Sequence, residues 1–223
     1  MKRGKTMALW TFGVLGALVA LWAGYTQFYE GNLGQPTYSV TSDMDGIEYR
    51  RYEPFVIAST QMNQQGRAGL NSGFRVLAGY IFGGNQPGER LAMTAPVLQQ
   101  KSPGESLPMT APVLQSPEAM RMAFVMPAHR TLESLPLPES QAVSLTNVNW
   151  GDVAAIRFSG FGKQEKFEKA EAYLRAALIK AGKVAAGPAL YAQYNSPSAF
   201  PPLRRNEVLI PLKDTGSSLN PAR

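Results

Sequence analysis

Residue types that commonly perform catalysis or bind metals are scarce in this chain of 223 residues. It contains no cysteine, which excludes disulfide bonds, thiolate metal sites and cysteine nucleophiles. Its single histidine, His129, excludes a histidine-rich metal cluster and leaves one candidate for a histidine-based triad. The sequence has no glycine-rich phosphate loop, nucleophile elbow or paired metal-binding motif. The composition therefore favours a binding protein over the common classes of enzyme.

Two groups of side chains remain that could bind a ligand. Methionine serves either as an adaptable core residue or as a thioether ligand. Five of the nine methionines fall within one stretch of 34 residues, and they are Met93, Met109, Met120, Met122 and Met126. Further along, Arg204 and Arg205 precede Glu207. The two guanidinium groups can either bind a carboxylate of a ligand or form an ion pair with Glu207.

The central feature of the sequence is a segment of seven residues, MTAPVLQ, which occurs twice with a spacing of sixteen positions. Each copy carries a proline, Pro96 or Pro112, inside an apolar run typical of a strand. Because proline cannot donate a hydrogen bond to a neighbouring strand, it is expected at a strand start, an edge or a bulge. Turn-forming residues occupy positions 101–106 between the copies. We therefore expect two extended segments joined by a loop.

Residues 1–26 have the composition of a membrane anchor or an uncleaved signal sequence. A basic start that contains Lys2, Arg3 and Lys5 precedes 19 uncharged residues, 7–25. That length is close to the roughly 20 residues needed to cross a bilayer. The basic residues favour a cytoplasmic N-terminus, which predicts that the remainder lies on the extracytoplasmic, periplasmic side. A cleaved signal peptide is the alternative, but the large side chain of Leu21 makes its cleavage site poor.

The rest of the sequence fits a single domain. Residues 27–36 form a short polar tether, residues 37–214 the domain, and residues 215–223 a frayed tail. The formal net charge is +6, but the basic residues beyond the tether are spread along the chain. They form no stripe typical of a nucleic-acid-binding surface, so we do not expect a nucleic-acid partner.

Periodicity predicts strands and two helices in a repeated order. Alternating and β-branched residues predict strands at 38–46, 47–52, 55–62, 120–126, 143–150, 153–158, 190–194 and 206–212. Apolar residues at helical spacing predict helices at 67–82 and 163–180. The order of two strands, a helix and two strands thus occurs twice. We therefore predict an α+β fold built from two related, βαββ-like halves.

Several motifs, taken together and in this order, resemble those of the SOUL family of heme-binding proteins. They are IEYRRYEPFVIA at 47–58, GYIFGGN at 79–85, the MTAPV segments, FVMPA at 124–128 and YNSPSAFPPLRRNEV at 194–208. The doubled MTAPV motif is similar to that of bacterial members, and the resemblance covers residues 36–215. It implies a distorted antiparallel β-barrel with two helices packed on it, to which this chain adds one N-terminal transmembrane helix.

The resemblance also implies that heme, or a related tetrapyrrole, binds in an apolar cleft between the first helix of the domain and the loop of its last hairpin. Apolar walls would contact the ring, and arginines would bind its carboxylates. An amphipathic helix also buries one face against its sheet, so the apolar helix residues are equally expected in the core. Carried over by position, the site residues are Phe74, Arg75, Leu77, Ala78 and Ile81 on the helix, and Tyr194, Phe200, Arg204 and Arg205 in the loop.

The resemblance does not supply an iron ligand. The histidine found near the start of the first helix in one branch of the family has no counterpart in residues 63–74, which favours open or Tyr/Met-assisted coordination. The leading hypothesis is a membrane-tethered, non-enzymatic domain that buffers or carries heme. The alternatives are an effector-binding domain for another apolar small molecule, or a small-molecule hydrolase in which Glu207 and Tyr194 act as acid or base. The sequence identifies no protein partner.

Overall fold

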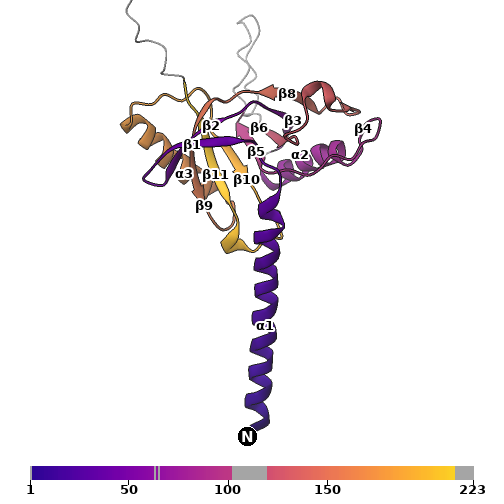
Figure 1. The fold of residues 1–223 in the computed structure, drawn as a ribbon, viewed down its shortest axis with the longest axis vertical. Coiled ribbons are helices and arrows are strands. Elements are labelled where there is room, and N and C mark those ends of the chain that lie inside the picture. The colour runs from indigo at the N-terminus through magenta and orange to yellow at the C-terminus, as the bar shows by residue number, and fades with distance from the viewer. Residues whose placement is uncertain (1, 63, 65, 102–119, 214–223) are drawn as a thin grey trace, which may run out of the picture.

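The computed structural model describes residues 2–62, 64, 66–101 and 120–213, with side chains in the first helix described from residue 13 onward. In this part of the chain the fold is α+β, with three α-helices and a large antiparallel sheet (Figure 1). The helices are α1 (Lys2–Phe28), α2 (Gly66–Ile81) and α3 (Gln164–Lys180), with short 3₁₀ helices η1 (Glu30–Asn32), η2 (Leu132–Ser134) and η3 (Pro201–Leu203). The strands are β1 (Tyr38–Met44), β2 (Ile47–Tyr52), β3 (Phe55–Met62), β4 (Asn85–Gln86), β5 (Val97–Lys101), β6 (Met120–Val125), β7 (Leu137–Pro138), β8 (Ser144–Val148), β9 (Asp152–Phe158), β10 (Leu190–Gln193) and β11 (Asn206–Pro211).

The secondary structure predicted for the domain agrees closely with the observed elements. β2 and β3 have the predicted bounds, and α2 and α3 begin and end within one residue of the predicted helices. α2 lies close against β3 because Gly73 lacks a side chain: a Cβ at this position would lie 3.0 Å from Cγ of Met62. α3 is followed by Gly182, whose φ of +64° is readily adopted only by glycine.

The sheet is built from the two predicted halves. The strand that opens the repeated order in each half, β2 or β8, pairs with a strand of the other half. The strand order is β1-β2-β9-β11-β10-β5-β6-β3-β8. Strands β9, β11 and β10 are therefore adjacent, as are β3, β6 and β5, whereas β2 pairs with β9 and β8 pairs with β3. Because β1 and β8 are the two edges of the described sheet, the sheet is open, and the predicted closure into a distorted barrel is wrong. A separate small sheet pairs β4 with β7.

Three apolar clusters hold these layers together. α2 packs on β3 and β6 through Leu77 and Ile81, which are both buried. α3 packs on the neighbouring half of the sheet through Phe167 and Leu174. The third cluster includes Leu209 of β11 and joins the middle strands on the face opposite the helices. The third cluster is separated from the other two because successive side chains of a strand point to opposite faces of the sheet.

The first MTAPV segment behaves as its proline predicts. β5 begins at Val97, directly after Pro96, so the proline stands at the strand start. Before it, the Thr94 hydroxyl donates to the carbonyl of Val125, and the Ala95 amide donates to the carbonyl of Gly34 at 2.9 Å. These bonds connect the motif to β6 and to the segment that precedes β1. The second copy, with Met109 and Pro112, lies outside the described residues.

The N-terminal segment forms a helix, α1, that projects from the domain (Figure 1). Among the helices whose side chains the structure describes, which in α1 start at Gly13, none has both the length and the apolar content to cross a bilayer. Helical structure continues into the predicted tether as far as Phe28, and η1 follows. Glu30 within η1 is buried, so this part of the predicted tether packs on the domain.

Candidate functional site

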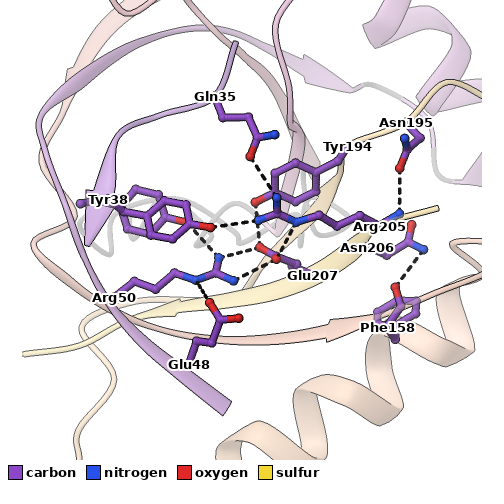
Figure 2. A network of polar contacts seen from close by, with 11 residues as sticks. Gln35, Tyr38, Glu48, Arg50, Phe158, Tyr194, Asn195, Arg205, Asn206 and Glu207 are labelled. Atoms are coloured by element: carbon purple, nitrogen blue, oxygen red, sulfur yellow. Dashed lines mark hydrogen bonds and ion pairs between the residues drawn. The ribbon is translucent and has the colours of Figure 1, made fainter. Parts of the chain in front are cut away.

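A buried ionic cluster lies at the start of β11, and its centre is the carboxylate of Glu207, which has no exposed surface. Arg50 of β2 donates from Nη1 and Nη2 to the two carboxylate oxygens, at 2.7 and 2.9 Å. Arg205 donates from Nε at 2.8 Å, and the Tyr194 hydroxyl donates at 2.7 Å (Figure 2). Four donor groups from three segments of the chain therefore surround one carboxylate.

Neighbouring side chains fix Arg50 in this position. Its Nε donates to Glu48 at 2.8 Å, and its Nη1 also donates to the Tyr52 hydroxyl at 3.2 Å. The guanidinium carbon lies 4.6 Å from the centre of the Tyr38 ring, a distance that permits a cation–π interaction. Arg50 is only 2% exposed, so its charge is neutralised within the protein.

Arg205 is held as firmly. Besides Glu207, its guanidinium donates to Gln35 at 3.0 Å and to the Tyr38 hydroxyl at 3.3 Å, and it stacks on the Tyr194 ring at 3.8 Å from the centre. Its backbone amide donates to Oδ1 of Asn195 at 2.7 Å (Figure 2). All three guanidinium nitrogens therefore have partners within the protein.

The arginines determine the ionisation of the cluster. Burial by itself raises the pKa of the Glu207 carboxyl group, but the hydrogen bonds and charge of Arg50, together with those of Arg205, lower that pKa below its ordinary value of 4.5. Burial and the nearby carboxylate raise the pKa of the Tyr194 hydroxyl well above 10.0. At neutral pH the pair is thus an ionised carboxylate and a protonated phenol. A general acid or base needs a pKa near the working pH, which neither group has.

The loop predicted to line a heme cleft is bonded to itself and to α1. Arg204 donates to the carbonyls of Ala199 and Pro197 at 3.0 and 2.5 Å, and its guanidinium lies 4.7 Å from the centre of the Phe161 ring. Phe200 packs edge-to-face on Trp22 of α1, with ring centres 5.0 Å apart. None of the contacts described for the two adjacent arginines involves α2.

The five predicted helix residues separate into two groups. Leu77 and Ile81 are buried in the core beneath α2, as an amphipathic helix requires. Arg75 is exposed on the outward side, and Ala78 is half-buried. Phe74 lies at the margin of that side: it is 41% exposed, but its ring packs edge-to-face on the buried Phe124, with ring centres 5.3 Å apart. No hydrogen bond, ion pair or ring contact described for the predicted loop residues, Tyr194, Phe200, Arg204 and Arg205, involves the predicted helix residues.

Two cavities open on the described part of the surface. One, of about 370 Å³, lies over the sheet face opposite the helices and is lined by Leu98, Leu190, Trp150 and Arg121, among others. The second, of about 330 Å³, lies near the turn after β6 and has a more polar lining, which includes Met126, Arg130 and Glu133. Both volumes fall at the small end of the range for ligand pockets, about 300–1,000 Å³.

The methionines and His129, which are the candidate iron ligands, do not gather together around a common site in the described part of the chain. Met122 and Met126 are buried in the cluster beneath α2, and Met93 and Met120 pack at its edge, which agrees with a role in core packing. His129 is exposed in the turn that follows β6. Among the residues that the structure describes, no group of three or more His, Cys, Asp and Glu side chains is arranged to hold a metal ion.

Arg50 and Tyr52 complete the ionic cluster, and neither was predicted as a site residue from the sequence. The available signal was Glu207 itself, a carboxylate directly before the apolar residues 208–211 of the strand. Since a buried charge is normally paired, that position required a cation from a neighbouring strand. The sequence does not identify which strand, because β2 reaches the cluster only through its pairing with β9, which in turn pairs with β11.

Solved structures share this fold at low sequence identity. A hydrolase from Listeria innocua matches with a TM-score of 0.52 and 10% identity, over 78% of this chain and 94% of that one. The EcmrR C-terminal domain matches with a TM-score of 0.54 and 10% identity, over 79% of this chain and 98% of that one. An uncharacterised conserved protein from Listeria innocua matches with a TM-score of 0.52, at 10% identity over 77% and 94% of the two chains. Identity this low shows a common fold only.

Sequence comparison gives a more specific result. No curated protein matches the chain. The family model of the SOUL heme-binding proteins matches residues 33–211, which include the whole sheet, α2, α3 and the buried ionic cluster. This match confirms the resemblance first seen in the MTAPV and RRYEPF motifs, and the chain belongs to the SOUL heme-binding protein family.

Proposed function

We propose that this protein binds heme or a related tetrapyrrole on the outward face of α2 and buffers or carries it without chemical conversion. The match of residues 33–211 to a heme-binding family carries the proposal. The exposed apolar character of α2 supports the location, since the core requires only the inner face of that helix.

The outward face of α2 has the shape that a flat ring needs. Phe74 and Phe82 are 41% and 61% exposed, and they stand eight residues apart, about 12 Å along a helix axis. Between them lie Ala78 and Gly79, and a Cβ at Gly79 would have no atom within 4 Å. Two aromatic side chains thus flank a low surface on which a planar apolar ligand can rest.

Cations for the propionates come from the same helix. Arg67 and Arg75 are both exposed, and residues at a spacing of eight lie near one side of a helix. A guanidinium binds a carboxylate through paired hydrogen bonds, so the two arginines suit a ligand with two carboxylates. α2 contains no histidine, cysteine or methionine, and its one tyrosine, Tyr80, is buried and donates its hydroxyl to the carbonyl of Pro136 at 2.9 Å. This helix would therefore hold the ring and its carboxylates and leave the iron without an axial ligand.

A hemin titration of the full chain tests the proposal. We expect a change in the Soret band that saturates near one equivalent. Arg75→Ala should weaken binding severalfold, whereas the matched control Arg157→Ala, an exposed arginine on β9, should not. A rise in absorbance without saturation would indicate adsorption and would contradict the proposal.

A second candidate function, the binding of another apolar small molecule as an effector, is favoured by the cavity over the sheet. Its walls include Leu98, Leu190 and Trp150, and Arg121 provides one cation at its rim. The test is a titration with small apolar carboxylates, observed through tryptophan fluorescence, with Trp150→Phe as the variant that should abolish the response. An unchanged response in that variant would remove this cavity from consideration.

A hydrolase that uses Glu207 and Tyr194 is a weaker alternative. The two groups lie 2.7 Å apart, but the carboxylate is ionised and its oxygens already accept hydrogen bonds from two arginines. Hydrolysis of a model ester that is lost in Glu207→Gln, while the fold is retained, would support this alternative over simple binding.

We further propose that α1 anchors the domain to a membrane, with the domain on the extracytoplasmic, periplasmic side. Residues 7–25 carry no charge and follow a basic start. From residue 14 onward several large apolar side chains of α1 are exposed, among them Val14 at 58%, Leu18 at 58% and Leu21 at 70%. Fractionation of cells tests the proposal: an anchored protein stays with membranes after a carbonate wash and is released by detergent, and its intact mass includes residue 1.

A further inference from the structure

The last turns of α1 are fixed to the loop between β10 and β11. The Trp22 indole Nε1 donates to the carbonyl of Ser198 at 2.8 Å, and its ring packs edge-to-face on Phe200. One turn later, the Thr26 hydroxyl accepts a hydrogen bond of 2.9 Å from the Phe200 amide. Thr26 is 1% exposed, so this contact excludes water.

A third contact lies one further turn along the chain. The Glu30 carboxylate accepts hydrogen bonds from the Ser196 amide and hydroxyl, at 3.2 and 2.5 Å, and Glu30 is 5% exposed. Trp22, Thr26 and Glu30 have a spacing of four residues, which places them along one side of the chain. Three successive turns therefore hold one loop, and the helix cannot pivot freely on the domain.

This attachment determines which surface of the domain faces the N-terminal part of α1. The loop that contains η3 lies beside α1 at the end of the domain from which the helix projects (Figure 1). Exposed apolar side chains gather at this end: Phe161 is 53% exposed, Leu203 38% and Trp22 42%. Arg204 lies against the Phe161 ring, which adds a cation to the same surface.

We propose that residues 196–203, together with Phe161, rest on the surface of the lipid bilayer in which α1 is anchored. The inference depends on the anchoring proposed above. Exposed aromatic and leucine side chains beside arginine are typical of segments at the boundary between headgroups and acyl chains. Trp22, which binds the loop, has the residue type most enriched at that depth. The domain is thus held in one orientation on the membrane. α2 takes no part in the described contacts between the loop and α1.

The absence of cysteine from the sequence allows a direct test with single-cysteine variants. The full chain carrying Leu203→Cys or Phe161→Cys is labelled with an environment-sensitive fluorophore. It is reconstituted in vesicles of phosphatidylcholine and phosphatidylglycerol that contain a nitroxide lipid quencher. The control is Ile179→Cys near the end of α3, which is 79% exposed. We expect at least threefold stronger quenching at positions 203 and 161 than at position 179.

Each other outcome has a definite meaning. Equal quenching at positions 203 and 179 in vesicle-bound protein would overturn this inference and leave the anchoring intact. Protein that a carbonate wash removes from the vesicles would overturn both proposals. A label at position 203 that neither the lipid quencher nor iodide in solution can reach would mean that a protein surface covers the loop, which also overturns the inference. Glu30→Ala in the Leu203→Cys background should lower lipid quenching without loss of vesicle binding, because it removes one of the three contacts that hold the loop in place.

Discussion

Replacing Arg50 with methionine tests whether the buried ionic cluster stabilises the sheet. Arg50 supplies two of the hydrogen bonds that reach the Glu207 carboxylate, and both residues are almost completely buried. Methionine retains most of the volume, so the main change is a buried carboxylate with one guanidinium neighbour in place of two. Removing one partner of a buried ion pair costs about 3–5 kcal/mol of unfolding free energy. Because Arg205 remains, we expect a value of about 3 kcal/mol, the lower end of that range.

Thermal unfolding followed by circular dichroism measures this effect. For a chain of this length each kcal/mol lowers Tm by about 2–4 °C, so Arg50→Met should lower Tm by roughly 6–12 °C. The matched control is Arg51→Met on the same strand, where a 65% exposed side chain pairs with Asp152. Exposed pairs contribute about 0–1 kcal/mol, so this variant should change Tm by less than about 4 °C. Equal effects of the two substitutions would refute the assigned role of Arg50.

The same variant should alter the dependence of stability on pH. The pKa of the Glu207 carboxyl is lower in the folded state than its ordinary value of 4.5. Ionisation of this group therefore stabilises the folded state above that pH, and the contribution is lost as pH falls through the lower pKa. We expect the difference in stability between the parent and Arg50→Met to be largest near pH 6–7 and to narrow below about pH 4. A difference that is independent of pH would show that Arg50 acts through packing alone.

Four further predictions concern α2 and η1. Gly79→Ala should raise stability by about 0.5–1 kcal/mol, as measured by thermal unfolding, since alanine favours helix and the site is open. Gly79→Glu should keep the fold, as judged by circular dichroism, but weaken hemin binding severalfold through repulsion of the propionates. Glu30→Ala should increase proteolysis within residues 196–203 without unfolding the sheet, because it removes two hydrogen bonds to Ser196. Iron-free protoporphyrin should bind with nearly the same affinity as hemin, because α2 offers no axial ligand; a preference of tenfold or more for hemin would contradict this.

The secondary structure was predictable because its signals are local. The residue types typical of a strand in residues 47–52 and the helical spacing of Leu77 and Ile81 are both local signals, and the observed strand and helix agree with them. The exchange of β2 and β8 between the halves was not predictable, because it depends on pairing between segments far apart in sequence. For the same reason the sequence does not identify Arg50 as the partner of Glu207. It does show that a buried carboxylate at this position needs a cation.

The sequence does not distinguish two neighbouring arginines whose contacts in the folded protein differ. Arg204 and Arg205 look equivalent in the sequence, and the family resemblance assigned both to ligand carboxylates. In the structure Arg205 binds the buried carboxylate of Glu207, two residues further along the chain, and Arg204 binds carbonyl groups of its own loop. Whether a guanidinium is available to a ligand depends on which acceptors lie nearby after folding, and no short motif encodes that.

These attachments favour α2 over the loop as the place where a tetrapyrrole binds. The loop is fixed at its end by Arg205 in the ionic cluster and in its middle by Trp22 and Thr26 of α1. A ligand that recruited its arginines would first have to break hydrogen bonds to a buried carboxylate and to main-chain carbonyls, and unpaired buried groups are costly. The outward face of α2 requires no such rearrangement, because Phe74 and Arg75 are already exposed there. A double substitution of Arg204 and Arg205 should therefore lower stability more than it lowers hemin affinity, whereas Arg75→Ala should do the reverse.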